Sequence, residues 1–118
     1  MSLKVRKNQS APPPERCALG ECMAVIAGAW APHVIWYLRA GPRRFSELRV
    51  DIPFVSAKVL SQRLRELEGR GVILRHVQPT KPPSVEYSLT ALGHDLVPAL
   101  QAIAEVGHKL KTTTRQGE

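Results

Sequence analysis

The chain has 118 residues, of which 17 are Lys or Arg and 10 are Asp or Glu, so its formal net charge is +7. This length fits one domain that buries roughly two-thirds of its unfolded surface, and the positive charge favours nucleic acid or an acidic membrane surface as partner. No apolar run approaches the roughly 20 residues of a membrane span, and the N-terminal residues lack the apolar core of a signal peptide. We therefore expect a cytoplasmic protein whose two cysteines are reduced.

The first 14 residues are polar and basic and end in three consecutive prolines. Consecutive prolines favour a locally stiff, extended chain. The polar, basic composition predicts a flexible arm over residues 1–14, ahead of one folded domain over residues 15–111. Such an arm is commonly disordered, although basic arms also enter the DNA minor groove. A polar tail over residues 112–118 is predicted to fray.

Three helices are predicted in the first half of the domain, from apolar residues at helical spacing. The first covers residues 15–27 and ends at Gly28-Ala29-Trp30. The second covers residues 31–39 and ends before Gly41-Pro42, since glycine and proline are typical of helix ends. A short third helix covers residues 45–51.

A fourth helix is predicted over residues 55–68, so soon after the third that the two form a helix-turn-helix. Ser56 is a suitable N-cap, and Gly69 with Gly71 ends the helix. One face carries leucines at helical spacing: Leu60, Leu64 and Leu67. The opposite face carries hydrogen-bond donors and cations: Lys58, Ser61, Gln62 and Arg65. Such side chains bind phosphates and base edges in a DNA major groove, but any amphipathic helix also exposes a polar face.

After the fourth helix, the apolar pattern changes to the period of a strand. Residues 72–77 and 84–89 are predicted to pair as an antiparallel hairpin, with Lys81 near the tip of its turn. A hairpin directly after a helix-turn-helix is the layout of a winged helix. A long last helix is predicted over residues 91–111, and Pro98 is predicted to end or kink it.

Several blocks of the sequence together resemble a known family. They occur in the family's order and at compatible spacings: Gly28-Ala29-Trp30, Gly41-Pro42-Arg43-Arg44-Phe45-Ser46-Glu47-Leu48, Leu60-Ser61-Gln62-Arg63-Leu64-Arg65-Glu66-Leu67-Glu68, Pro82-Pro83-Ser84-Val85-Glu86-Tyr87-Ser88-Leu89-Thr90 and Leu92-Gly93. On these blocks the chain resembles the HxlR-type transcriptional regulators, which are bacterial winged helix-turn-helix proteins related in fold to the MarR group.

The resemblance implies a mainly α fold with a small β-hairpin, in which the N-terminal and C-terminal helices build a homodimer. It also implies that the dimer binds double-stranded, pseudo-palindromic operator DNA and regulates transcription. It assigns DNA contacts to six positions: Ser56, Lys58, Ser61, Gln62, Arg65 and Lys81 in the wing. The residues themselves already point to most of these positions, whereas the dimer comes mainly from the resemblance.

The resemblance also singles out Cys17. Some HxlR-type regulators sense oxidants or electrophiles through a cysteine thirteen residues before the Trp of the Gly-x-Trp block, and Cys17 has that spacing from Trp30. A helix start beside Arg16 favours the reactive thiolate. The Pro that often follows such a cysteine is absent, because Ala18 comes next. Cys17 is thus a candidate redox sensor, with a small buried side chain as the alternative.

The chain has no phosphate loop, dinucleotide fingerprint or nucleophile motif, so we expect neither enzyme activity nor a cofactor. Its cysteines and histidines follow no zinc-site spacing, and we predict no metal site. Three aromatic residues form a stripe at the start of the second helix: Trp30, His33 and Tyr37. The stripe is either packing or a pocket for a small-molecule effector.

Two functions are compatible with this layout. The first is a dimeric, DNA-binding transcriptional regulator, and the second is a winged helix used as a protein–protein interaction module. The cationic face with Lys58 and Arg65, the wing residue Lys81 and the net charge of +7 favour DNA.

Overall fold

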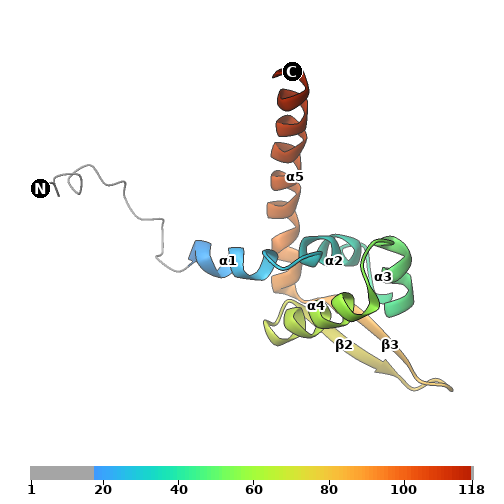
Figure 1. Ribbon diagram of the computed structural model, residues 1–118. Coiled ribbons are helices and arrows are strands. Elements are labelled where there is room, and N and C mark those ends of the chain that lie inside the picture. Colours follow the sequence, from blue (N-terminus) through green and yellow to red (C-terminus); the bar gives the residue numbers. More distant parts are fainter. Residues whose placement is uncertain (1–17, 118) are drawn as a thin grey trace, which may run out of the picture.

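Within residues 18–117, which the computed structural model describes, the chain forms five helices and a three-stranded antiparallel sheet (Figure 1). The elements follow one another as α1 (Ala18–Ile26), α2 (Ala31–Leu38), β1 (Arg43–Arg44), α3 (Phe45–Asp51), α4 (Ala57–Gly69), β2 (Ile73–Gln78), β3 (Ser84–Leu89) and α5 (Ala91–Gly117). The winged helix-turn-helix predicted from the sequence is confirmed. The arm predicted over residues 1–14 lies outside the described residues.

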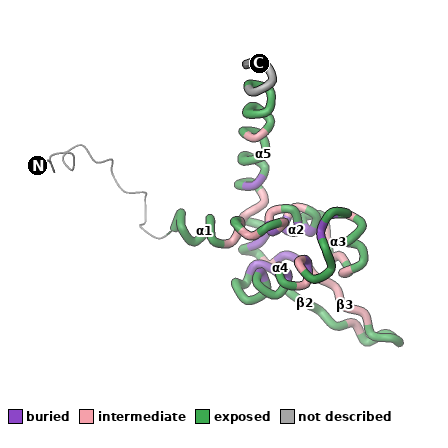
Figure 2. The backbone as a smooth tube through the Cα atoms, in the orientation of Figure 1, coloured by how far each residue is buried: buried purple, intermediate pink, exposed green. Residues whose placement is uncertain are grey.

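The core lies where α2, α3 and α4 meet the sheet and the first turns of α5 (Figure 2). The leucine face predicted for α4 is buried, since none of Leu60, Leu64 and Leu67 is more than 2% exposed. Burying a leucine side chain contributes about 1.5–3 kcal/mol to folding. Burial of these three leucines fixes the rotation of α4 about its axis, and the polar face of the helix is therefore turned to solvent.

Both ends of α4 are capped as the sequence indicates. The Ser56 hydroxyl accepts a hydrogen bond from the Val59 N–H at 3.1 Å. At the other end, the N–H groups of Gly71 and Val72 donate to the carbonyls of Glu68 and Leu67 at 3.0 and 2.9 Å. Together with a φ of 76° at Gly71, these bonds form a Schellman motif. Gly69, predicted to help end the helix, is its last residue instead.

The sheet contains one strand that the sequence did not predict. β1 is only two residues long, and Arg43 and Arg44 pair with Tyr87 and Glu86 of β3. Two residues are too few to show an alternating pattern. The predicted hairpin is confirmed, with β2 and β3 paired from Ile73 and Leu89 to Gln78 and Ser84.

α5 differs from its prediction at Pro98 and at its end. The helix continues through Pro98, which was predicted to end or kink it, and runs past Lys111 to Gly117. Leu100 is buried in the core, and Leu96 and Val97 pack against it. Core packing on both sides of Pro98 holds the helix together despite the missing N–H.

α1 has no buried residue, although its sequence is largely apolar. Its Leu19 and Met23 side chains are 57% and 50% exposed. Beyond its first turns, α5 also extends away from the domain (Figure 1). In the described part of the chain no single helix is long and apolar enough to cross a membrane, and the one pair that meets the criterion jointly, α1 with α2, is bent by 87°.

Candidate nucleic-acid interface

The outward face of α4 presents the side chains that the sequence predicted for DNA contact. Lys58, Gln62 and Arg65 are exposed, as is Ser56 at the N-cap, while Ser61 is half-buried at the flank. Arg65 donates to the Ser61 hydroxyl at 3.0 Å, which leaves the rest of its guanidinium free for an anion. No salt bridge involves Lys58 or Arg65 within the described residues. The face therefore keeps its positive charge.

A groove of about 410 Å³ lies between α4 and the sheet. Its lining comes from both elements: Ser61, Leu64, Arg65, Glu68, Arg75 and Tyr87. Arg75, on β2, brings a second guanidinium to the same groove as Arg65. Strand periodicity places Arg75 on one face of the hairpin but does not show that this face meets α4, so the sequence did not single it out.

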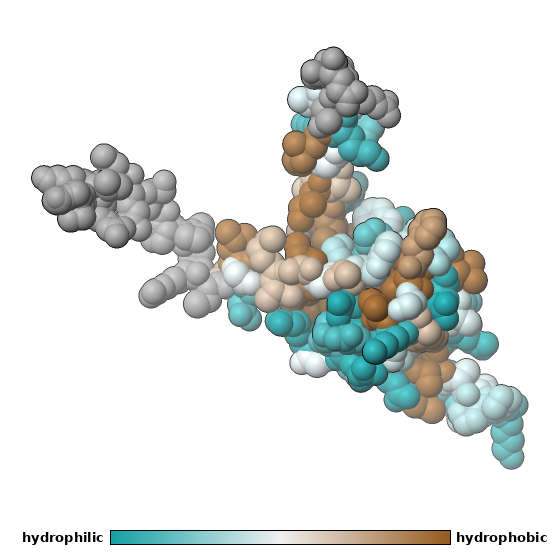
Figure 3. All heavy atoms as spheres, viewed as in Figure 1, coloured by the Kyte–Doolittle hydropathy of each residue, from teal (hydrophilic) through white to brown (hydrophobic). Residues whose placement is uncertain are grey.

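The β2–β3 hairpin extends beyond the helices as the wing, and its tip is hydrophilic (Figures 1 and 3). Lys81 lies in the connecting turn and is exposed. The turn is held by the Thr80 hydroxyl, which donates to the Pro82 carbonyl at 2.9 Å. The structure thus places Lys81 at the tip of the hairpin, separate from the cluster on α4.

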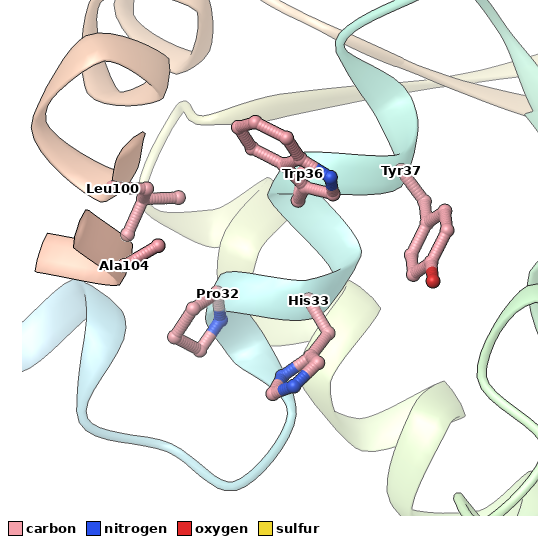
Figure 4. Close-up of a pocket in the computed structure, with 6 residues that line it drawn as sticks. All are labelled: Pro32, His33, Trp36, Tyr37, Leu100 and Ala104. Carbon is pink, nitrogen blue, oxygen red and sulfur yellow. The ribbon is translucent and has the colours of Figure 1, made fainter. Parts of the chain in front are cut away.

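The predicted aromatic stripe is divided between the core and a groove. Trp30 packs against the core, and its ring centroid lies 5.0 Å from that of His33. An open, mainly apolar groove of about 290 Å³ runs between α2 and α5 (Figure 4). Its lining residues are Pro32, His33, Trp36, Tyr37, Leu100 and Ala104. Trp36, rather than Trp30, therefore belongs to the groove with His33 and Tyr37.

Comparison with known proteins shows the family to which this winged helix-turn-helix chain belongs. Residues 25–115 match the family model described as HxlR-like helix-turn-helix. The chain belongs to this family. The HxlR-like resemblance of the sequence is thereby confirmed, and with it a DNA-binding regulator of transcription of the helix-turn-helix type.

Individual relatives agree with this assignment. The uncharacterized HTH-type transcriptional regulator YkvN of Bacillus subtilis is 43% identical over 91 residues, which is 77% of each chain. The solved structure of a putative MarR-family regulator from Porphyromonas gingivalis is 35% identical, with a TM-score of 0.76 over 84% of this chain and 97% of that one. The redox regulator HypR in its oxidized form is also 35% identical, with a TM-score of 0.73 over 79% of this chain and 96% of that one.

Of the two cysteines, only Cys22 lies within the described residues. Cys22 is a free, exposed thiol on α1, and it lines a small groove with Val25, Leu92 and Leu96. Cys17, the predicted redox residue of this HxlR-like chain, lies outside the described residues. Among the described residues, no three His, Cys, Asp or Glu side chains are grouped so that they could hold a metal ion.

Proposed function

We propose that this protein is a dimeric, sequence-specific DNA-binding regulator whose α4 enters the major groove while its wing contacts the flanking backbone. The observation that carries the proposal is the exposed face of Lys58, Gln62 and Arg65, whose orientation is fixed by the buried leucines opposite. Arg75 beside Arg65 and Lys81 at the tip of the same hairpin extend the positive surface from this face towards the wing. A major groove accepts one helix with such donors.

Substitutions on this face test the proposal. Lys58→Ala and Arg65→Ala should each weaken binding and lower the slope of log K against log salt by about one, because each removes a phosphate contact. Gln62→Ala should instead relax the sequence preference, at a cost of about 1–3 kcal/mol if Gln62 binds a base edge with two hydrogen bonds. Fluorescence anisotropy with selected and random duplexes at several salt concentrations measures both effects.

Lys109→Ala is the matched control for charge, since Lys109 is exposed on the part of α5 that extends away from the wing and α4 (Figure 1). It should change the salt slope little. Lys81→Ala should weaken mainly the salt-dependent binding common to all sequences, because a wing-tip cation contacts the backbone. Parent-like binding by all the α4 variants would rule out α4 as the DNA-contacting helix.

The dimer in this proposal is supported by apolar surface that the domain itself leaves uncovered. Leu19 and Met23 on α1 are exposed, and α5 carries Ile103, Val106 and Leu110, each more than half exposed. The last three recur at the spacing of one helical face, and hydrophobic side chains line the extended part of α5 (Figure 3). A two-fold dimer through these helices would set two α4 helices one DNA turn apart, about 34 Å.

We further propose that Cys17 makes the affinity for DNA sensitive to oxidants. The support is its spacing from Trp30 and the similarity of the chain to HypR, whose solved structures are described as oxidized and reduced forms of a redox regulator. Mild peroxide or diamide treatment should change operator affinity in the parent and in Cys22→Ser, but not in Cys17→Ser. An equal response of Cys17→Ser and the parent would show that the sensing group is not this thiol.

A further inference from the structure

Arg63 lies on α4 among the DNA-facing residues, yet its side chain turns back into the protein. Its Nε donates to the backbone carbonyl of Ala29 at 2.9 Å, and its side chain is only 17% exposed. The contact joins α4 to the turn between α1 and α2, 34 positions earlier in the chain. Arg63 is therefore unavailable for a phosphate, and its role in DNA binding must be indirect.

Glu66 connects Arg63 to the exposed face. One carboxylate oxygen of Glu66, Oε1, accepts from Arg63 at 3.1 Å, and the other, Oε2, accepts from the side-chain Nε2 of Gln62 at 3.4 Å. An ionised carboxylate only accepts hydrogen bonds, so Gln62 must turn its NH₂ group towards Glu66. This contact favours one of the two orientations of the Gln62 amide and leaves its oxygen and its second N–H for a base edge.

We propose that Glu66 and Arg63 are positioning residues that set the base preference of Gln62, an inference that rests on the proposed function. A Gln side chain with a fixed acceptor and donor complements the N6 donor and N7 acceptor of adenine in the major groove. Because the side chain is oriented before binding, less conformational freedom is lost when the base contact forms. Arg63 holds Glu66, and the Ala29 carbonyl holds Arg63.

Gly28 makes room for this chain of contacts. A Cβ at position 28 would lie 3.0 Å from the Nε and 3.2 Å from the Cδ of Arg63. These distances are shorter than normal carbon contacts, and Arg63 cannot yield without lengthening its bond to Ala29. The absence of a side chain at Gly28 thus leaves the space that the Arg63 side chain of α4 occupies.

The test compares sequence preference in matched variants. The parent protein is used to select sequences from a random duplex library, and affinities are then measured for the selected duplex and for all its single-base variants. Gln62→Ala should lose preference at one position of each half-site, and Glu66→Gln should lose about threefold or more at that same position. Since removing a carboxylate raises affinity for every duplex, ratios between sequences are the readout. Glu105→Gln, which removes the same charge from an exposed position on α5, outside the groove, should leave the ratios unchanged.

Further outcomes decide between the inference and the proposed function. In a Gln62→Ala background, Glu66→Gln should have no additional effect on the ratios, because the two residues act through one contact. Additive effects, or equal effects of Glu66→Gln and Glu105→Gln, would overturn the inference. If Gln62→Ala loses preference at no position, the inference fails while the proposed function stands. A parent protein that selects no sequence overturns both.

Gly28→Ala tests the part of the network that is remote from the DNA face. It should lower preference at the Gln62 position with little change in the salt slope, because no charge is altered. Gly20→Ala on α1 is its control, since nothing lies within 4 Å of a Cβ there. Thermal melting of both variants checks that the fold is retained. Full preference in a folded Gly28→Ala protein would remove Arg63 from the proposal.

Discussion

Gly93→Ala is expected to destabilise the fold by about 3 kcal/mol or more, in the range of severe overpacking. A Cβ at this position would overlap the backbone carbonyl oxygen of Val72 and would lie 2.9 Å from a methyl group of Leu89. The Val72 carbonyl is held in place, because it accepts from the Thr90 N–H at 3.0 Å. Urea unfolding followed by circular dichroism measures the loss.

Gly69→Ala is the matched control for this glycine. Gly69 is the last residue of α4, nothing lies within 4 Å of a Cβ there, and its φ is not in the left-handed region. Alanine should therefore leave stability unchanged or raise it by up to about 1 kcal/mol through helix propensity. If Gly93→Ala unfolded at the same urea midpoint as the parent, α5 could shift away from the Val72 carbonyl without loss of stability.

The close approach of α5 to Val72, just before β2, illustrates which parts of the fold the sequence predicts. Periodicity and end signals predicted α2, α3, α4 and both strands of the hairpin to within one or two residues, because those signals are local. The need for glycine at position 93 depends on the backbone carbonyl of Val72, some twenty residues earlier, so the Leu92-Gly93 block could be noticed but not explained. The sequence left open whether Pro98 ends or kinks the helix, and α5 continues through it because the core contacts of Leu96, Val97 and Leu100 override a local preference.

In the candidate site, too, local patterns predicted some residues, whereas others depend on long-range contacts. The exposed positions of Lys58, Gln62 and Arg65 follow from the buried leucines of α4, because one helix face determines the other. Arg75 was missed because its approach to Arg65 depends on how the sheet packs against α4. The sequence did not set Arg63 apart from the exposed cations, because its contact with Ala29 spans 34 positions. Long-range contacts, rather than composition or spacing, separate the cations that face solvent from those that position other residues.

The turn between α1 and α2 shows a further limit. Trp30 caps α2 with a φ of 70°, in the left-handed region that non-glycine residues seldom occupy. The packing of its indole against the core offsets this strain. By contrast, Phe54, in the turn between α3 and α4, is 86% exposed and has no positive φ. The backbone conformation, and not the residue type alone, therefore decides that Trp30 is strained and Phe54 is not.

Ile103→Glu is expected to split the proposed dimer and to lower operator affinity by about 100-fold or more, because each subunit then binds its half-site without the other. Ile103 is 53% exposed in the single chain, so the domain itself should remain folded. A carboxylate buried between two α5 helices would lose its hydration without gaining a partner. Sedimentation at micromolar concentration should give twice the mass of the chain for the parent and a single chain for the variant.

Thr112→Glu is the control for this substitution, since Thr112 is exposed and lies about 180° around α5 from Ile103. It adds the same charge to the same helix and should leave both the mass and the affinity close to those of the parent. If Ile103→Glu also sediments as the parent does, the exposed face of Ile103, Val106 and Leu110 is not the interface. A parent that sediments as a single chain at all concentrations would refute the dimer, and α4 would then have to bind single half-sites independently.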